Sequence, residues 1–206
     1  MSEKLVYLVD DDEAVRRSAG FMLKTSGYTV KSFASGVELL KEKELAPGCI
    51  LLDVRMPDMD GLQVQKALQE RGIALPVIVM TGHGDVNVAV QAMKAGAVDF
   101  IEKPFEKSVL SSALDEGFAR LDQAGRHHKR ADEARVRLQT LTPREHDVLE
   151  GLVRGHPNKT IAYDLDISPR TVEIHRANLM SKLGVASLSE ALRIAFAAGL
   201  GEERPA

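Results

Sequence analysis

Residues 4–120 alternate five times between a short apolar segment and a segment with helical periodicity. Such alternation constrains the fold strongly, because short β-branched segments bounded by turn residues indicate buried strands, and each is followed by one helix. The expected strands are Leu5–Val9, Thr29–Phe33, Cys49–Leu52, Pro76–Met80 and Val98–Ile101, and the expected helices are Glu13–Ser26, Gly36–Lys43, Gly61–Arg71, Val86–Ala95 and Lys107–Leu121. Strands that alternate with helices form a parallel sheet covered on both faces, so we predict a five-stranded, doubly wound α/β domain.

The chain has 206 residues, which is long enough for a second domain. Residues 141–200 show helical patterns only, and we expect an all-α domain of four helices. The first of these begins with Thr142 as N-cap and Glu145 three residues later, a capping box. The segment 122–140 joins the two domains. Its weak apolar spacing favours a solvated helix, whereas Gly125 favours a flexible linker, and both interpretations stay open. The predicted domains are therefore 1–121 and 141–206, with a linker at 122–140.

Composition excludes several classes of protein. No run of 18 apolar residues exists, so neither a membrane span nor a membrane partner is expected. The single cysteine, Cys49, precludes an internal disulfide and agrees with a reducing cytoplasm. The formal net charge is −3, so nucleic-acid binding cannot be inferred from bulk charge and must come from a local motif.

Polar side chains follow four of the expected strands. Asp10 and Asp11 come after the first strand, Asp53 after the third, Thr81 after the fourth and Lys103 after the fifth. The carboxyl ends of parallel strands meet at one edge of the sheet, so these groups should lie together. Carboxylates, a hydroxyl and an ammonium suit a hard divalent cation and a phosphoryl group. We interpret the next acid, Asp12, as a helix N-terminal acid rather than a metal ligand.

With these motifs in this order, residues 1–121 resemble the receiver domain of bacterial two-component response regulators, which has a flavodoxin-like fold. The resemblance implies that Asp53 is the phosphoacceptor. It also implies a Mg²⁺ site, which Mn²⁺ can share, made by Asp11, Asp53 and the backbone carbonyl of Arg55, with Asp10 acting through water. Thr81 and Lys103 would contact the phosphoryl oxygens, and the bond from Lys103 to Pro104 is expected to be cis.

Two further residues near this site each have two interpretations. Phe100 lies where receivers carry an aromatic residue that moves inward when Thr81 turns toward the phosphoryl group. The alternative is that Phe100 belongs to the core. His83 could be a phosphodonor or a metal ligand, but a surface-loop histidine is the preferred interpretation, since no second histidine lies near it in the motif.

Residues 141–185 resemble the LuxR/NarL type of helix-turn-helix domain, through the segments "LTPRE", "NKTIA" and "ISPRTVEIHRANLMSKLG". We expect Thr160–Leu165 as the first helix of the motif and Pro169–Leu183 as the recognition helix in the major groove of double-stranded DNA. Phosphate contacts are expected from Lys159, Thr171, Arg176, Asn178 and Lys182. Base contacts are expected, by family position, from Glu173, Ile174 and Ala177. The alternative for Arg176 and Lys182 is that they are ordinary solvated charges.

Both halves together resemble the FixJ group of response regulators, whose best-known members control nitrogen-fixation genes. The resemblance implies a cytoplasmic, non-enzymatic transcription regulator that a sensor histidine kinase phosphorylates. It also implies that phosphorylation produces a homodimer and releases the DNA-binding domain. The receiver interface would include Val88, Val90, Gln91, Lys94 and Ala95. One departure is Asn87, where the group is expected to have proline.

Two rival functions compete with this interpretation. A haloacid-dehalogenase-type phosphatase also uses a strand-end Asp, Mg²⁺, a Thr and a Lys. Its nucleophile is followed two residues later by a second Asp, whereas Asp53 is followed by Val54 and Arg55. The second rival is a regulator that binds DNA constitutively, and the complete set of strand-end residues argues against it.

Overall fold

The computed structural model describes residues 4–82 and 86–201. The chain divides into two compact units, with the boundary between residues 124 and 125, and each unit is described by itself. The strands are β1 (Leu5–Val9), β2 (Thr29–Phe33), β3 (Cys49–Asp53), β4 (Val77–Thr81) and β5 (Asp99–Glu102). The helices of the first unit are α1 (Glu13–Thr25), α2 (Gly36–Lys41), α3 (Gly61–Glu70), α4 (Val86–Lys94) and the beginning of α5 (Lys107–Leu138).

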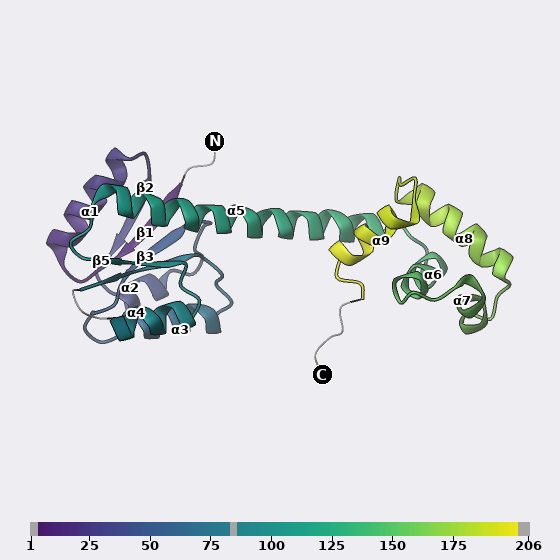
Figure 1. Ribbon diagram of the computed structural model, residues 1–206, viewed down its shortest axis with the longest axis horizontal. Coiled ribbons are helices and arrows are strands. Elements are labelled where there is room, and N and C mark those ends of the chain that lie inside the picture. The colour runs from purple at the N-terminus through teal and green to yellow at the C-terminus, as the bar shows by residue number, and fades with distance from the viewer. Residues whose placement is uncertain (1–3, 83–85, 202–206) are drawn as a thin grey trace. The chain divides into compact units, whose positions relative to one another are not determined.

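The five strands form one parallel sheet in the order β2-β1-β3-β4-β5, which confirms the predicted doubly wound architecture (Figure 1). Register brings the ends of β1 and β3 side by side, because Val9 pairs with Leu52. Asp53 in turn pairs with Met80 of β4. The residues directly after β1 therefore lie beside the end of β3, at the edge of the sheet where the functional side chains were expected.

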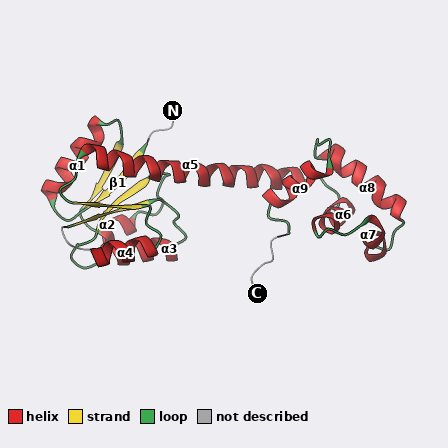
Figure 2. Ribbon diagram, in the orientation of Figure 1, coloured by secondary structure: helices red, strands yellow, loops and turns green. Residues whose placement is uncertain are grey.

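Helices cover both faces of the sheet, with α1 and α5 on one side and α2, α3 and α4 on the other (Figure 2). Each face has its own apolar core. One core contains Leu23 of α1 and Leu114 of α5, and the other contains Leu39 of α2 and Val64 of α3. Strands buried on both faces explain why β3 and β4 are apolar at nearly every position rather than alternating.

Helix α5 differs from the prediction. We expected it to end at Leu121, but it continues without a break to Leu138 and includes Gly125. One glycine costs a helix about 1 kcal/mol relative to alanine. The segment after Gly125 is rich in good helix formers, and it carries spaced ion pairs such as Lys129–Glu133. Of the two open interpretations of the segment 122–140, the structure shows the helix as far as Leu138.

The second unit contains the end of α5 and four further helices, α6 (Pro143–Val153), α7 (Asn158–Asp164), α8 (Pro169–Lys182) and α9 (Leu188–Ala197). The predicted capping box is present, with Thr142 and Glu145 each accepting from the other's backbone N–H. Ser168 caps α8 in a similar way. At Gly151 of α6 an added Cβ would lie 2.7 Å from the side chain of Ile161, so glycine there allows α6 and α7 to approach closely.

The core of this unit is formed by buried apolar side chains from all its helices. They are Leu138, Val148, Leu149, Leu152, Ile161, Ala162, Val172, Leu179, Leu183, Ala191 and Ala195. Within residues 4–82 and 86–201, no helix combines the length and apolar character needed to cross a membrane.

Candidate functional site

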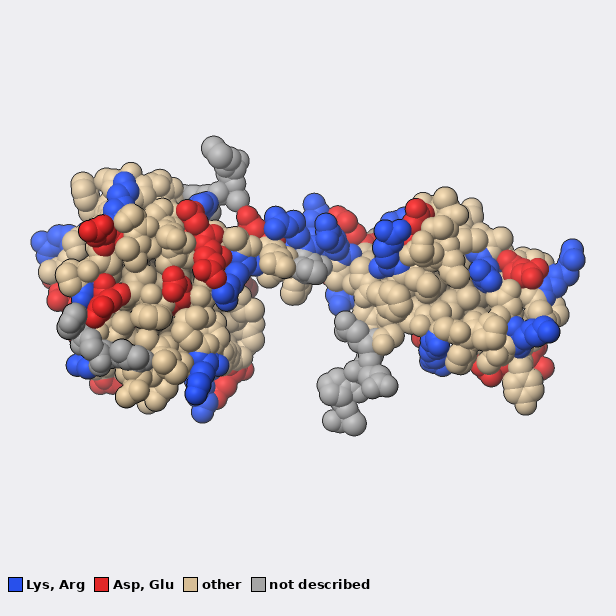
Figure 3. Space-filling model, viewed as in Figure 1, with Lys and Arg blue, Asp and Glu red and all other residues tan. Residues whose placement is uncertain are grey.

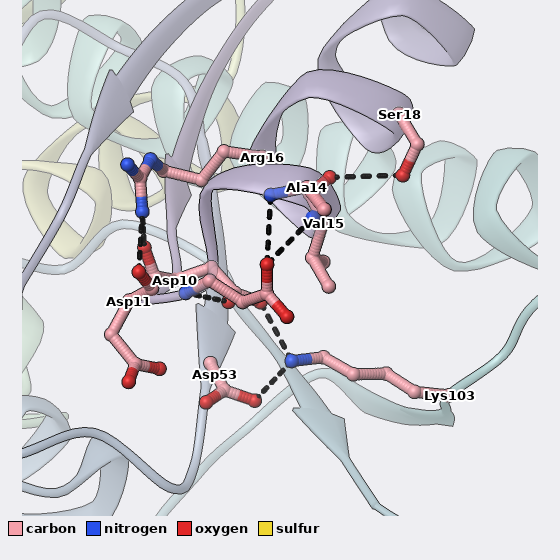
Figure 4. Close-up of polar contacts among 9 residues, drawn as sticks. Asp10, Asp11, Ala14, Val15, Arg16, Ser18, Asp53 and Lys103 are labelled. Carbon is pink, nitrogen blue, oxygen red and sulfur yellow. Dashed lines mark hydrogen bonds and ion pairs between the residues drawn. The ribbon is translucent and has the colours of Figure 1, made fainter.

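Three carboxylates meet at the carboxyl edge of the sheet. Asp10 and Asp11 follow β1, Asp53 is the last residue of the central strand β3, and one oxygen from each lies within 4.8 Å of the other two (Figure 4). Asp10 and Asp53 are buried, whereas Asp11 is exposed. The strand ends thus bring Asp53 together with acids 42 and 43 positions earlier in the sequence, as predicted.

Lys103 is bound to two of these acids. Its Nζ atom lies 2.6 Å from Oδ2 of Asp10 and 2.6 Å from Oδ1 of Asp53 (Figure 4). Burial alone would lower the pKa of Lys103, but the hydrogen bonds to Asp10 and Asp53 outweigh it and raise the pKa. The lysine is therefore charged at neutral pH. The peptide bond from Lys103 to Pro104 is cis, as expected.

Asp53 experiences opposing influences. Burial raises its pKa, the hydrogen bond and charge of Lys103 lower it, and the charges of Asp10 and Asp11 raise it, with a net increase. One ammonium among three carboxylates leaves negative charge in excess, which a divalent cation would balance. Mg²⁺ binds oxygen ligands at about 2.0–2.1 Å, so its ligands lie up to about 4.2 Å apart. The three carboxylates, with oxygens within 4.8 Å of one another, are the kind of ligand that this ion binds.

Backbone contacts hold the acids in place. Asp12 is the N-cap of α1, accepting from the N–H of Ala14 at 2.7 Å, which confirms its interpretation as a helix-terminal acid. Arg16, which the sequence interpretation missed, donates through Nη1 to the carbonyls of Asp10 and Asp11 at 2.7 and 2.8 Å. Figure 4 shows this guanidinium over the loop that carries both acids. A basic residue one turn into a helix is common, so the sequence offered no signal that this one folds back.

Helix α3 begins directly against Asp53. A Cβ added to Gly61 would lie 2.4 Å from the carbonyl oxygen of Asp53, which is closer than any side chain can come. The N–H of Gly61 also donates to the carbonyl of Val54 at 2.9 Å. Arg55, whose carbonyl was predicted as a metal ligand, follows in the loop between β3 and α3.

The expected switch residues lie on neighbouring strands. Thr81 ends β4, is almost completely buried, and donates its hydroxyl to the carbonyl of Gly82 at 3.2 Å. Phe100 of β5 is 45% exposed, so the alternative that it belongs to the core is wrong for this conformation. His83 lies outside the described residues.

The predicted interface residues lie on or directly after α4, which packs on β4 and β5. Val90, Gln91 and Lys94 are exposed, while Val88 and Ala95 are half-buried. Met93, which was not predicted, is 41% exposed on the same helix. Phe100 adds to the exposed apolar side chains of these two neighbouring elements.

In the second unit the side chains expected at base edges are accessible on α8. Ile174 is 54% exposed, and Glu173 and Ala177 are also exposed. Among the expected phosphate contacts, Lys159 and Asn178 are exposed and Thr171 is half-buried. Figure 3 shows acidic and basic side chains interspersed on the visible face of this unit, in agreement with its balanced composition.

Two of the expected phosphate contacts have partners within the unit, so the alternative of ordinary solvated charges is wrong for both. Arg176 donates to Oδ1 of Asn158 at 2.8 Å. Lys182 donates to Oε2 of Glu145 at 2.7 Å. Burial opposes ionisation of Glu145, but Lys182 and the contacts with Thr142 outweigh it and lower the pKa of Glu145. Both cations thus anchor α8, to α7 and α6 respectively.

Comparisons with known families divide the chain in the same way. The response regulator receiver domain family matches residues 6–115. The family of bacterial regulatory proteins called the luxR family matches residues 139–195. Together the two matches contain all the site residues described above.

Several relatives are similar over nearly the whole chain. The transcriptional regulatory protein FixJ of Rhizobium meliloti strain 1021 is 49% identical over 202 residues, which cover 98% of this chain and 99% of that protein. The tetrathionate response regulatory protein TtrR of Salmonella typhimurium is 40% identical and covers 91% of this chain and 90% of its own.

Solved structures of response regulators are also similar to nearly the whole chain. The response regulator StyR is 35% identical, with a TM-score of 0.77, and the match covers 95% of this chain and 99% of that one. Full-length FixJ from B. japonicum is 41% identical, with a TM-score of 0.60, over 98% of this chain and 100% of that one.

Proposed function

The chain belongs to the FixJ-like two-component response regulators, which join a receiver domain to a LuxR-type DNA-binding domain, and we propose that phosphorylation of Asp53 by a sensor histidine kinase controls its binding to DNA. The family consists of transcription regulators and is not classed with enzymes. One observation carries the proposal: the carboxylate of Asp53 lies within hydrogen-bond distance of Lys103 and within 4.8 Å of two further acids.

The chemistry assigned to these residues is transfer of a phosphoryl group. An oxygen of Asp53 attacks the phosphorus of the phosphorylated kinase histidine, the P–N bond breaks, and an acyl phosphate forms on Asp53. The ammonium of Lys103, already beside Oδ1 of Asp53, stabilises negative charge on the phosphoryl oxygens. Asp11, Asp53 and the backbone carbonyl of Arg55, with Asp10 through water, would hold a Mg²⁺ ion, and this ion, or Mn²⁺ in its place, would supply the remaining positive charge.

The switch that we propose runs from Thr81 to Phe100. The hydroxyl of Thr81 would leave the carbonyl of Gly82 and donate to a phosphoryl oxygen. That movement would vacate space at the end of β4, and the exposed ring of Phe100 would move toward it. A phosphoryl group shifts this equilibrium only through its stronger interaction with one of the two conformations, and the new hydrogen bond of Thr81 provides that difference.

The output is dimerisation through α4 and β5, with release of the DNA-binding domain. Burial of the Phe100 ring would remove it from the exposed apolar surface that also includes Val90 and Met93 of α4, and so would change the shape of that surface. A linked pair of DNA-binding domains raises the effective concentration of the second domain and can increase affinity by roughly 10²–10⁴ without new contacts. We therefore expect an inverted pair of half-sites in double-stranded DNA, and a cytoplasmic location, where that DNA lies.

On DNA, α8 would occupy the major groove. The exposed side chains of Glu173, Ile174 and Ala177 would face base edges, and Lys159, Thr171 and Asn178 would contact phosphates. Arg176 and Lys182 carry additional N–H groups besides those used within the unit, so phosphate contacts from them remain part of the proposal.

The test is chemical phosphorylation. The protein is incubated with acetyl phosphate and Mg²⁺, and the adduct is located by mass spectrometry; we expect one phosphate on Asp53. Asp53→Asn should abolish it. Asp12→Asn is the matched control, because it changes a neighbouring acid that caps α1 and should leave the adduct unchanged. A stoichiometric phosphate elsewhere, still formed in Asp53→Asn, would contradict the proposal.

A further inference from the structure

The C-terminal end of the recognition helix α8 is bound by a residue of α5. Arg137 donates through Nη2 to the carbonyl oxygen of Leu183, the C-cap of α8. Carbonyls at a helix C-terminus have no partner within the helix and carry its partial negative charge, so a guanidinium is well suited to bind there. Gly184, with a φ of +62°, lies next to this contact, and a Cβ added there would be 3.7 Å from the guanidinium.

The last turns of α5 also belong to the core of the second unit. Ala134 and Leu138 are buried, with 5% and 7% of their surface exposed, and Leu138 packs in the same core as Leu179 of α8 and the C-cap residue Leu183. The family match begins at residue 139 and therefore leaves this part of the chain out. The packing of Leu138 does not depend on the Arg137 contact, and it independently places the end of α5 beside α8.

Three side-chain contacts thus hold α8, each to a different helix: Arg176 to Asn158 of α7, Lys182 to Glu145 of α6, and the carbonyl of Leu183 to Arg137 of α5. We propose that Arg137 is a positioning residue for DNA recognition, which fixes the C-terminal end of α8 so that its base-facing side chains enter the groove in one position. The DNA-binding module then functionally includes the last turn of α5.

Loss of this contact would act on binding more than on folding. The core and two other contacts still hold α8 when Arg137 is replaced. The helix end would gain freedom, however, and DNA binding would have to remove that freedom again, which lowers affinity. A direct contact between Arg137 and a DNA phosphate would also lower affinity, but it would change the salt dependence, because each phosphate contact contributes about 0.9 to the slope of log K against log salt.

The experiment compares full-length wild type with Arg137→Met, Arg137→Lys and Arg135→Met. Arg135→Met removes the same charge two residues away, where the arginine pairs only with exposed Asp132 among the contacts described. The probe is a duplex selected from a random-sequence pool with the wild-type protein. Affinity is measured over a range of salt concentrations, and hydrogen–deuterium exchange is followed over residues 180–185.

Arg137→Met should bind roughly 3- to 10-fold more weakly, as expected for loss of a partly exposed hydrogen bond from a charged donor, with an unchanged salt slope. Exchange at the end of α8 should increase. Arg137→Lys should recover part of the affinity, and Arg135→Met should bind like wild type. The proposal is overturned if Arg137→Met behaves like Arg135→Met, if its salt slope falls by about one, if exchange in α8 is unchanged, or if the Lys and Met variants bind equally weakly.

Discussion

The ammonium of Lys182 lies 2.7 Å from Oε2 of Glu145, whose side chain is only 4% exposed. The same carboxylate oxygen accepts from the backbone N–H of Thr142 at 2.8 Å, so one buried group joins the end of α8 to the start of α6. The sequence predicts Lys182 as a phosphate contact, and the structure gives it a second role within the fold.

Lys182→Ala should therefore destabilise the DNA-binding unit as well as weaken binding. Glu145 would be left buried without its cation, and because Lys182 itself is partly exposed we expect a loss of about 1–2 kcal/mol in the free energy of unfolding. Lys159→Ala is the matched control: this exposed lysine should leave stability unchanged and reduce the salt slope of DNA binding by about one. The stability of both variants is measured by denaturant titration. If Lys182→Ala unfolds like the wild type and like Lys159→Ala, then Lys182 has only a surface role.

Asp53→Asn should stabilise the receiver domain at neutral pH. Folding raises the pKa of Asp53, so the folded protein binds that proton more tightly than the unfolded chain, and raising the pH through this pKa destabilises the fold. Asp53→Asn has no carboxyl to ionise at this position, so its fold is not destabilised in this way as the pH rises. Its advantage in thermal midpoint should be a few degrees at pH 7–8 and should shrink as the pH falls below the raised pKa of Asp53, because the carboxyl of the wild type then becomes protonated.

Magnesium gives an independent readout of the same site. Adding Mg²⁺ should raise the thermal midpoint of the wild type, because the ion binds the folded state, and should raise it less in Asp53→Asn or Asp11→Asn. Calorimetry that shows equal Mg²⁺ stabilisation of all three proteins would place the metal elsewhere.

Glu173→Gln should change which DNA sequences are bound. A carboxylate in the major groove accepts from the amino group of cytosine, and a base contact contributes about 1–3 kcal/mol of discrimination. Selection from a random-sequence pool should give a different consensus at one position in each half-site. The same selection with Lys159→Ala should return the wild-type consensus. An unchanged consensus with Glu173→Gln would remove this residue from the set of base contacts.

Val90→Glu should prevent dimerisation of the phosphorylated protein. A charge on α4 would be buried in the proposed interface at a cost that the contact cannot recover. Val109→Glu on α5 is a close control, because both valines are 47% exposed. Sedimentation after treatment with acetyl phosphate should give a monomer for Val90→Glu and a dimer for Val109→Glu and the wild type. Dimers in both variants would move the interface away from α4.

Local signals account for the success of the fold prediction. Apolar segments and turn residues are properties of neighbouring residues, so strand and helix ends lie within about two residues of the predicted positions, apart from the end of α5. The sequence predicts an end at Leu121 because few strong apolar residues follow and because a flexible linker is favoured by Gly125. The destabilisation of the helix by Gly125 is small beside the stabilisation gained by burying Ala134 and Leu138 further along the same helix.

Contacts between distant side chains explain what the sequence could not show. The acids and Lys103 were predictable together because a parallel sheet fixes where its strand ends meet. No such rule connects Lys182 with Glu145, 37 residues away, or Arg137 with Leu183, 46 residues away. Surface arginines and lysines look alike in a sequence, and only the packing of the helices selects those that bind a buried or terminal group.

Gly61 has a consequence for any systematic mutational survey of this protein. Alanine scanning assumes that each replacement removes atoms, but here alanine adds one, 2.4 Å from the carbonyl oxygen of Asp53. To relieve this overlap, the first turn of α3 would have to shift away from β3, and the backbone of Asp53 would move as well. Position 61 would then score as severely as a reacting residue, although it contributes no functional group. A loss-of-function map would therefore identify position 61 because the backbone of Asp53 leaves no room for a side chain there, and not because Gly61 takes part in the chemistry.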